Sequence, residues 1–200
     1  IVVVPADTDH SGRPLPPTSV VRARTADGTR LACTDVVSTD DLLHLFPPGS
    51  GQADDGVLTV GGCRVDDIAT EFDTPVMIVS ESALRSRARE YLDGLRSRWP
   101  RSRVVFASKA FPATAVQRVM VEEGLGLDVA GAGEIRTALR AGVDPEDVVL
   151  HGNAKSDDEI AMAVEQGLGF VVVDNLDDLD RLEATVPAGC QQPVLVRVIP

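Results

Sequence analysis

Residues 148–173 read VVLHGNAKSDDEIAMAVEQGLGFVVV and contain the repeating unit of this chain. Short apolar runs rich in β-branched residues begin and end the stretch, and residues 157–166 between them have the apolar spacing of a helix. Ser156 can cap this helix together with Glu159, and Gly167 follows its last turn, where a left-handed residue is favoured. The stretch therefore predicts a strand, a helix and a second strand joined by short loops.

The same alternation begins at residue 74 and continues to the last residue. The predicted strands cover residues 76–80, 104–108, 127–129, 148–151, 170–173 and 194–198, and the predicted helices cover residues 81–98, 113–123, 133–141, 157–166 and 176–185. Strands that alternate with helices through short loops form a parallel sheet with helical cover, so we predict an α/β fold.

Two parallel architectures are compatible with this alternation. An open doubly wound sheet usually has a glycine-rich phosphate turn after its first strand, whereas Ser80, Glu81 and Ser82 stand there in this chain. Strand starts that lie 21 to 28 residues apart suit a (β/α)8 barrel. We therefore predict that residues 74–200 form an incomplete (β/α)8 TIM-type barrel of six strands and five helices, truncated before the barrel closes.

The residues before the barrel have a different pattern. Residues 1–54 hold six of the 13 prolines and predict little regular structure beyond a hairpin within residues 20–33. Residues 55–73 predict a short hairpin that turns at residues 61–62, followed by a helix over residues 65–72. Because the chain begins without Met and ends within a predicted strand, we expect it to be a piece of a longer protein.

The composition excludes several classes of protein. A net charge of −12 argues against nucleic-acid binding, which needs basic residues to neutralise phosphates. No apolar run approaches the roughly 20 residues of a membrane span. Three widely spaced cysteines, Cys33, Cys63 and Cys190, fit neither a disulfide framework nor a zinc site. Because apolar residues make up 44% of the chain, we expect a globular protein. The cysteine pattern indicates a reducing cytoplasm, and the lack of a His/Cys cluster predicts no metal site.

Lysine is rare in this chain, because 17 of the 19 basic residues are Arg and only Lys109 and Lys155 are Lys. Lysine differs from arginine in that its amine can lose a proton and attack a carbonyl carbon to form a Schiff base. Lys109 directly follows a strand that the sequence predicts to be buried, and an amine held against apolar walls is more readily deprotonated. Lys109 is therefore a candidate nucleophile; the alternative is a lysine that extends from a strand end into solvent.

Other polar residues follow the predicted strands, and in a (β/α)8 barrel the carboxyl ends of the strands form the catalytic face. Asp128 and Glu134 are either loop and helix-capping acids or charges placed near Lys109 and a cofactor. His151 either ends its strand or lines a pocket. Arg197 points into or out of the barrel, and an inward position requires an anion nearby.

Two further residues on this face have simpler interpretations. We expect Lys155 to be a solvated surface lysine, because it lies in a loop that leads into a helix. We expect Asp174 to cap the end of its strand. The acidic residues that follow Asp174 lack the glycine and glutamate spacing of a calcium loop, so a solvated helix start is predicted there.

Taken in order, several motifs resemble one enzyme family. They are Phe-Ala-Ser-Lys109-Ala-Phe, Glu-Glu-Gly-Leu-Gly-Leu-Asp128-Val, Gly-Ala-Gly-Glu134, Leu-Arg-Ala-Gly-Val and His151-Gly-Asn-Ala-Lys155-Ser. Residues 55–200 resemble the barrel domain of the fold-type III, pyridoxal-phosphate-dependent decarboxylases, and within these they are most similar to the diaminopimelate decarboxylases. Alanine racemases share the barrel and the lysine but follow it with Tyr-Gly-His-Gly, which this chain lacks.

The resemblance implies a cofactor and a set of site residues. Lys109 would bind pyridoxal 5'-phosphate covalently, and Asp128, Glu134, His151 and Arg197 match family positions close to the cofactor. Residues 151–155 match the His-Gly-Asn-x-Lys stretch that separates diaminopimelate decarboxylases from their ornithine and arginine relatives. The implied reaction is decarboxylation of meso-2,6-diaminopimelate to L-lysine, the last step of bacterial lysine biosynthesis, in a homodimer.

The departures from the family leave alternatives open. Phe111, Ala132 and Ala154 stand where many members have Asn, Gly and Asn, and residues 1–54 do not resemble the family. The phosphate loop and the C-terminal β-domain of the family would lie beyond Pro200, so the isolated chain is expected to be inactive. The alternatives are an ornithine- or arginine-type decarboxylase and a non-catalytic protein that binds the cofactor.

Overall fold

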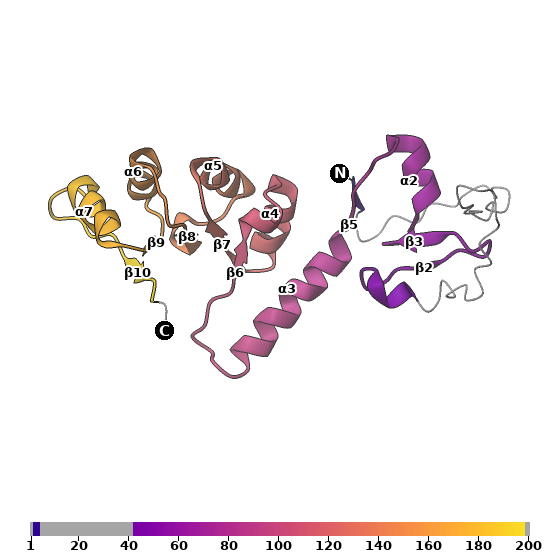
Figure 1. The fold of residues 1–200 in the computed structure, drawn as a ribbon. Coiled ribbons are helices and arrows are strands. Elements are labelled where there is room, and N and C mark those ends of the chain that lie inside the picture. The colour runs from indigo at the N-terminus through magenta and orange to yellow at the C-terminus, as the bar shows by residue number, and fades with distance from the viewer. Residues whose placement is uncertain (1, 5–41, 199–200) are drawn as a thin grey trace, which may run out of the picture. The chain divides into compact units, whose positions relative to one another are not determined.

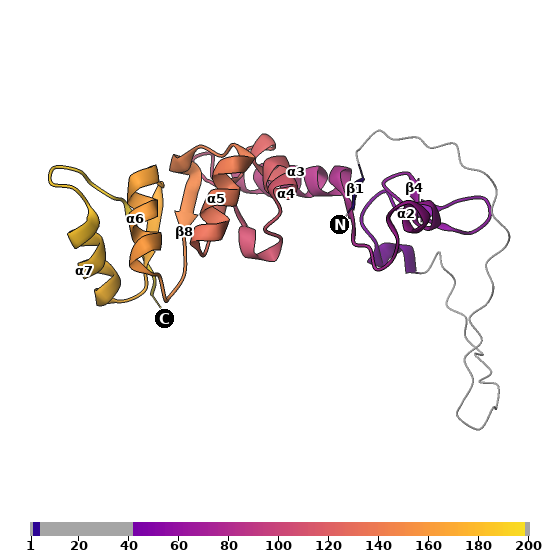
Figure 2. The same cartoon turned by 90° about the horizontal axis from the view of Figure 1, so that it is seen from above.

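The computed structural model describes residues 2–4 and 42–198. The chain divides into two compact units, Ile1–Ala83 and Leu84–Pro200, and each is described by itself (Figures 1 and 2). The hairpin predicted within residues 20–33 lies outside the described residues. The predicted domain boundaries after residues 54 and 73 stay predictions.

The first unit contains two small sheets. Strands β2 (Gly51–Gln52), β3 (Leu58–Val60) and β4 (Cys63–Arg64) form an antiparallel sheet in that order, and α2 (Val65–Phe72) follows directly. The predicted hairpin and helix of this region are therefore present, and β2 is an additional strand. In the other sheet β1 (Val2–Val4) pairs in parallel with β5 (Ile78–Ser80).

The second unit is a single parallel sheet. Its strands are β6 (Val105–Ala107), β7 (Gly126–Val129), β8 (Val148–Leu150), β9 (Phe170–Val173) and β10 (Val194–Val196), and they lie side by side in chain order. A doubly wound sheet reverses its strand order at a switch point, whereas a barrel adds each strand beside the one before it. The chain order of the five strands therefore confirms the incomplete barrel, which is open between β6 and β10.

The helices of this unit connect successive strands. They are α3 (Glu81–Arg96), which begins at the end of the first unit, and then α4 (Thr114–Glu122), α5 (Ala132–Ala141), α6 (Asp157–Gln166) and α7 (Leu176–Thr185). Figure 1 shows α4 to α7 in a row along one face of the sheet, and each contacts the next in sequence. The predicted caps are present, since Ser156 and Glu159 form a capping box and Gly167 is left-handed with φ of 67°.

One predicted strand does not join this sheet. Residues 76–80 were predicted to form the first strand of the barrel, and the structure places β5 there but pairs it with β1 in the first unit. An apolar run predicts that a strand exists but does not identify its partner, because the backbone groups that form the ladder are the same in every residue. The parallel sheet of the second unit thus contains five of the six predicted strands.

The hydrophobic core of the second unit lies between the sheet and the helices. Alternate residues of the central strands enter it, among them Leu127, Val129, Val148, Leu150 and Val171, each at most 1% exposed. Helix residues that are buried against them include Ile135, Ala138, Ile160, Ala163 and Leu182. Each fully buried Leu or Ile contributes about 1.5–3 kcal/mol of hydrophobic stabilisation. Because strand side chains alternate between faces, the residues between these core positions point to the opposite face of the sheet.

At the amino end of β9 the backbone of Gly169 passes close to the backbone of Glu146, so a substitution there tests the packing. A methyl group at Gly169, just before β9, would overlap the backbone carbonyl oxygen of Glu146. We expect Gly169→Ala to lower the free energy of unfolding by about 2 kcal/mol or more, because neither backbone segment can move without disturbing the sheet. Gly94→Ala, within α3 and with open space around it, is expected to raise that free energy by about 0.5–1 kcal/mol. Urea unfolding measures both values, and equal effects of the two substitutions would contradict this packing.

Candidate active site

Three of the predicted site residues follow adjacent strands at their carboxyl ends. Lys109 lies in a short 3-10 helix, Ser108–Ala110, directly after β6, and His151 directly follows β8. Between them, Asp128 of β7 pairs with Ala107 on one side and with Val149 on the other. Asp128 lies between two core residues of its strand, so its side chain is on the face of the sheet that the helices do not cover.

Asp128 is the electrostatic centre of this group. Its carboxyl is half-buried, and its Oδ1 atom is buried without a hydrogen-bond partner among the described residues. Burial raises the pKa of Asp128 above its usual range, the charges of His151 and Lys109 oppose that rise, and the charge of Glu134 adds to it. The structure therefore places Lys109, Glu134 and His151 close enough to Asp128 for their charges to act on its carboxyl.

Of the two environments considered for Lys109, the structure shows the second. The side chain is exposed at the end of its strand and is not enclosed by apolar walls. The reason is local, because β6 ends at Ala107 and the 3-10 turn buries Ser108 instead. Lys109 is thus distinguished by its position at the end of the strand that neighbours the strand of Asp128, and not by burial.

Glu134 closes the turn between β7 and α5. Its Oε2 atom accepts a hydrogen bond from the backbone N–H of Ala130 at 2.9 Å. From the neighbouring helix, Glu159 accepts one from the N–H of Ala132 at 3.2 Å. Glu134 thus fixes the turn that follows Asp128 in addition to contributing charge near it. The loop interpretation made from the sequence holds, and a position near a cofactor stays a prediction.

Arg197 lies in a different part of the same edge. Its Nη1 atom donates to Asp174 Oδ1 at 3.0 Å, and its backbone N–H donates to the carbonyl oxygen of Val173 at 2.9 Å. It follows β10, three strands from Asp128, a separation of about 14 Å across a sheet with strands roughly 4.8 Å apart. Arg197 thus has Asp174 as its anionic partner, and Asp174 forms an ion pair at the end of its strand.

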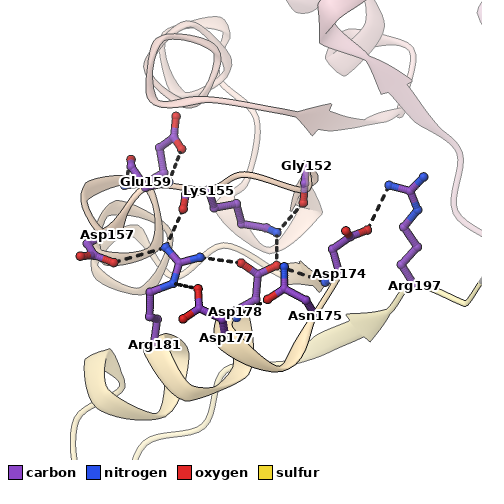
Figure 3. Close-up of polar contacts among 11 residues, drawn as sticks. Gly152, Lys155, Asp157, Glu159, Asp174, Asn175, Asp177, Asp178, Arg181 and Arg197 are labelled. Carbon is purple, nitrogen blue, oxygen red and sulfur yellow. Dashed lines mark hydrogen bonds and ion pairs between the residues drawn. The ribbon is translucent and has the colours of Figure 1, made fainter.

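Lys155 is the residue whose environment the sequence analysis predicted incorrectly. It was expected on the surface, whereas its side chain is 1% exposed. Its Nζ atom donates to Asp178 Oδ2 at 2.9 Å and to the carbonyl oxygen of Gly152 at 2.5 Å, as Figure 3 shows. The sequence offered one signal for this site: lysine is rare in this chain, and residue 155 is one of its two lysines.

Asp178 is a fully buried carboxylate with several donors around it. It accepts hydrogen bonds from Lys155, from the backbone N–H of Asp174 at 3.1 Å and from Arg181 at 2.8 Å. Burial alone would raise the pKa of Asp178, but these hydrogen bonds and the charges of Lys155 and Arg181 outweigh it and lower the pKa. Asp178 is therefore charged at neutral pH although its side chain is closed to water. The sequence analysis treated this residue as part of a solvated helix start.

The described residues contain no group of three His, Cys, Asp or Glu side chains that could hold a metal ion. Over the same part of the chain, no helix is both long and apolar enough to cross a membrane. A groove of about 740 Å³ lined by Arg103, Glu146 and Phe170 lies at the amino ends of the strands, on the edge opposite to Lys109.

Comparison with known proteins identifies the class to which this fold and its lysine belong. Residues 82–200 match the family model described as "Pyridoxal-dependent decarboxylase, pyridoxal binding domain", and the chain belongs to this family. Within it, the chain is similar to diaminopimelate decarboxylases. The diaminopimelate decarboxylase of Mycobacterium tuberculosis is 40% identical over 164 residues, which cover 80% of this chain and 36% of the relative.

Solved structures agree with the family. The diaminopimelate decarboxylase of M. jannaschii in complex with L-lysine matches with a TM-score of 0.64 and 26% identity, covering 70% of this chain and 33% of that one. The lysine/ornithine decarboxylase of Vibrio vulnificus in complex with putrescine matches with a TM-score of 0.57 and 26% identity, covering 67% and 35%. The chain thus spans about a third of the length of the relatives that it matches.

The burial of Asp128 predicts a pH-dependent effect on stability. A carboxyl whose pKa is raised by folding is more easily charged in the unfolded chain, so it destabilises the fold once pH exceeds that raised value. We expect Asp128→Asn to raise the unfolding temperature at pH 7, with a gain that shrinks as pH falls and disappears below the usual carboxyl range. Thermal unfolding followed between pH 3 and pH 8 measures this gain. The control is Asp180→Asn on the exposed side of α7, and a gain at Asp128 that is the same at every pH would refute the electrostatic cause.

Proposed function

We propose that this chain provides the pyridoxal-phosphate-binding part of a carboxy-lyase that converts meso-2,6-diaminopimelate to L-lysine, the final reaction of lysine biosynthesis. One observation carries the proposal: the exposed amine of Lys109 lies beside the half-buried Asp128 carboxyl, at the carboxyl edge of a sheet in a pyridoxal binding domain. The 40% identity to a diaminopimelate decarboxylase supports the choice of substrate.

The residues at this edge fit a pyridoxal cofactor. Lys109 offers a primary amine that can bind an aldehyde covalently. Asp128 offers a buried oxygen that lacks a protein donor among the described residues, so it can accept a hydrogen bond from a ligand. His151 and Glu134 lie close enough to Asp128 to act on its charge, and Arg197 offers a cation farther along the edge. We propose these five residues as the cofactor-binding set, with Lys109 as the catalytic residue.

Each residue of the set has a task that follows from its chemistry. When bound, the cofactor supplies an electron sink for the electron pair that remains after CO2 leaves an amino acid. Lys109 Nζ can hold a proton and release it to a neighbouring acceptor, and its charge acts on the Asp128 carboxyl. Glu134 holds the turn after Asp128 in place by accepting a hydrogen bond from the Ala130 N–H.

The substrate assignment also depends on groups outside this set. Diaminopimelate carries an amine and a carboxylate at both ends, and the residues above account for the reacting end only. We therefore propose that the complete protein supplies the groups for the distal end and that this chain alone is inactive. The proposal includes a homodimer and a cytoplasmic location, both of which rest on the family resemblance.

The cofactor assignment predicts the effect of a single substitution. After incubation with pyridoxal phosphate and reduction with borohydride, peptide mapping of the complete protein encoded by the natural gene should place one stoichiometric label on Lys109. Lys109→Arg should abolish that label while circular dichroism and the unfolding temperature stay close to wild type, because Arg keeps the charge but not a reactive amine. Lys155, whose amine is closed to solvent, serves as the internal control and should stay unlabelled. A label of undiminished stoichiometry in Lys109→Arg would refute the assignment.

The substrate assignment has a separate test. We expect the complete protein to release CO2 from meso-2,6-diaminopimelate with a kcat/KM at least about a hundredfold above that for L-ornithine, L-arginine or L-lysine, since a site that pairs a polar distal end rejects substrates lacking it. Preference for L-ornithine or L-arginine would assign the protein to the alternative decarboxylase type. Labelling at Lys109 without CO2 release from any of these amino acids would favour a non-catalytic cofactor-binding protein.

A further inference from the structure

The buried ion pair between Lys155 and Asp178 lies between two of the proposed cofactor-binding residues. Lys155 is in the loop after β8, which begins with His151, and Asp178 is in the first turn of α7. Figure 3 shows that hydrogen bonds lead from this pair toward Gly152 on one side and through Asp174 to Arg197 on the other. The two sides are called the His151 arm and the Arg197 arm below.

The His151 arm fixes the backbone on both sides of one peptide unit. The N–H of His151 donates to the carbonyl oxygen of Val129 in β7 at 2.7 Å. The carbonyl oxygen of the next residue, Gly152, accepts from Lys155 Nζ at 2.5 Å. Because the first bond holds His151 to the strand of Asp128 and the second holds Gly152 to the buried pair, the backbone that carries the imidazole has little freedom to rotate.

The Arg197 arm fixes the start of the loop after β9. Asp178 Oδ2, the atom that pairs with Lys155, also accepts from the backbone N–H of Asp174 at 3.1 Å. The Asp174 carboxylate in turn accepts from Arg197 Nη1 at 3.0 Å. One carboxylate oxygen thus connects the lysine of one loop with the residue that orients the guanidinium of the next strand.

The energetics of a buried ion pair favour a geometric role over a stabilising one. Withdrawing two charges from water costs about as much as their attraction returns, and replacing such a pair with apolar residues is often neutral or stabilising. The side chains of Lys155 and Asp178 are 1% and 0% exposed, so this cost falls on both groups, although the partly exposed Arg181 also pairs with Asp178 at 2.8 Å. Apolar replacements could fill the space, but they could not hold the Gly152 carbonyl or the Asp174 N–H.

We propose that Lys155 and Asp178 are positioning residues, which hold His151 and Arg197 in the orientation that the cofactor requires without touching it. This inference rests on the proposed function for its purpose, although the geometry of the two arms is independent of it. Loss of the pair should loosen both loops together and weaken cofactor binding, even in a protein that remains folded.

The test uses the double variant Lys155→Met/Asp178→Leu in the complete natural protein. We expect it to unfold within a few degrees of wild type, while its dissociation constant for pyridoxal phosphate rises roughly tenfold, the scale on which orienting partners act. The circular dichroism of the bound chromophore should also fall, and amide hydrogen exchange over residues 151–156 should become faster in the cofactor-free protein. The matched control is Arg87→Gln/Glu90→Gln, which removes an exposed ion pair from α3 and should change none of these quantities.

The outcomes separate this proposal from the proposed function. Wild-type affinity together with unchanged exchange over residues 151–156 would overturn the positioning role and leave the cofactor assignment intact. If the wild-type protein does not bind pyridoxal phosphate at all, the proposed function fails; faster exchange in the double variant then still supports the two arms, and unchanged exchange refutes them.

A second pair of variants applies if the double variant does not fold. Asp174→Ala cuts the Arg197 arm at a half-buried side chain and leaves the buried pair in place, whereas Asp177→Ala removes a neighbouring exposed carboxylate that pairs only with Arg181 among the described residues. We expect the dissociation constant for pyridoxal phosphate to rise several-fold in Asp174→Ala and to stay unchanged in Asp177→Ala. Equal affinities in the two variants would refute the proposal.

Discussion

Parallel strand pairing in chain order is the constraint on which the rest of this structure depends. Because β6 to β10 are parallel, each connecting segment must return from one edge of the sheet to the other, and α4 to α7 make that return along one face. The core residues of the strands point to those helices, and the residues between them point away. The same constraint brings the ends of neighbouring strands together. Lys109, Asp128 and His151 therefore lie at one edge of the sheet, although the first and the last are 42 positions apart in the chain.

The features that sequence analysis predicted well are those that local interactions determine. The helices over residues 157–166 and 176–185 have the predicted bounds, because their first turns are capped by Ser156 and Asn175 within three residues. The strands of the second unit were found within two residues of their ends, because short apolar runs between helical segments define them. The barrel was predicted from the spacing of the strands and from the absence of a glycine-rich turn after residue 80, neither of which requires knowledge of a contact.

The features that the sequence did not predict depend on partners distant in the chain. The pairing of β5 with β1 could not be read from either run of residues, since backbone ladders carry no sequence code. Lys155 was expected in solvent because its loop is polar, and only Asp178, 23 residues later, makes its burial possible. For Lys109 the sequence left open whether the side chain is enclosed or exposed, and the 3-10 turn that follows its strand decides for exposure. Polar residues in loops are thus the least predictable part of the candidate site, whereas their presence on one edge was predictable.

Under the proposed roles, the two lysines of the chain use properties that arginine does not share. Elsewhere in the described residues arginine forms the ion pairs, such as that of Arg64 with Asp55, where its planar fork donates two hydrogen bonds to one carboxylate. The chemistry proposed for Lys109 needs a nucleophilic amine, which a guanidinium does not provide. The amine of Lys155 is closed to solvent and donates both to Asp178 and to the carbonyl oxygen of Gly152. In a chain with 17 arginines and two lysines, the same compact amine thus stands at a site proposed to react and at a site that joins two loops.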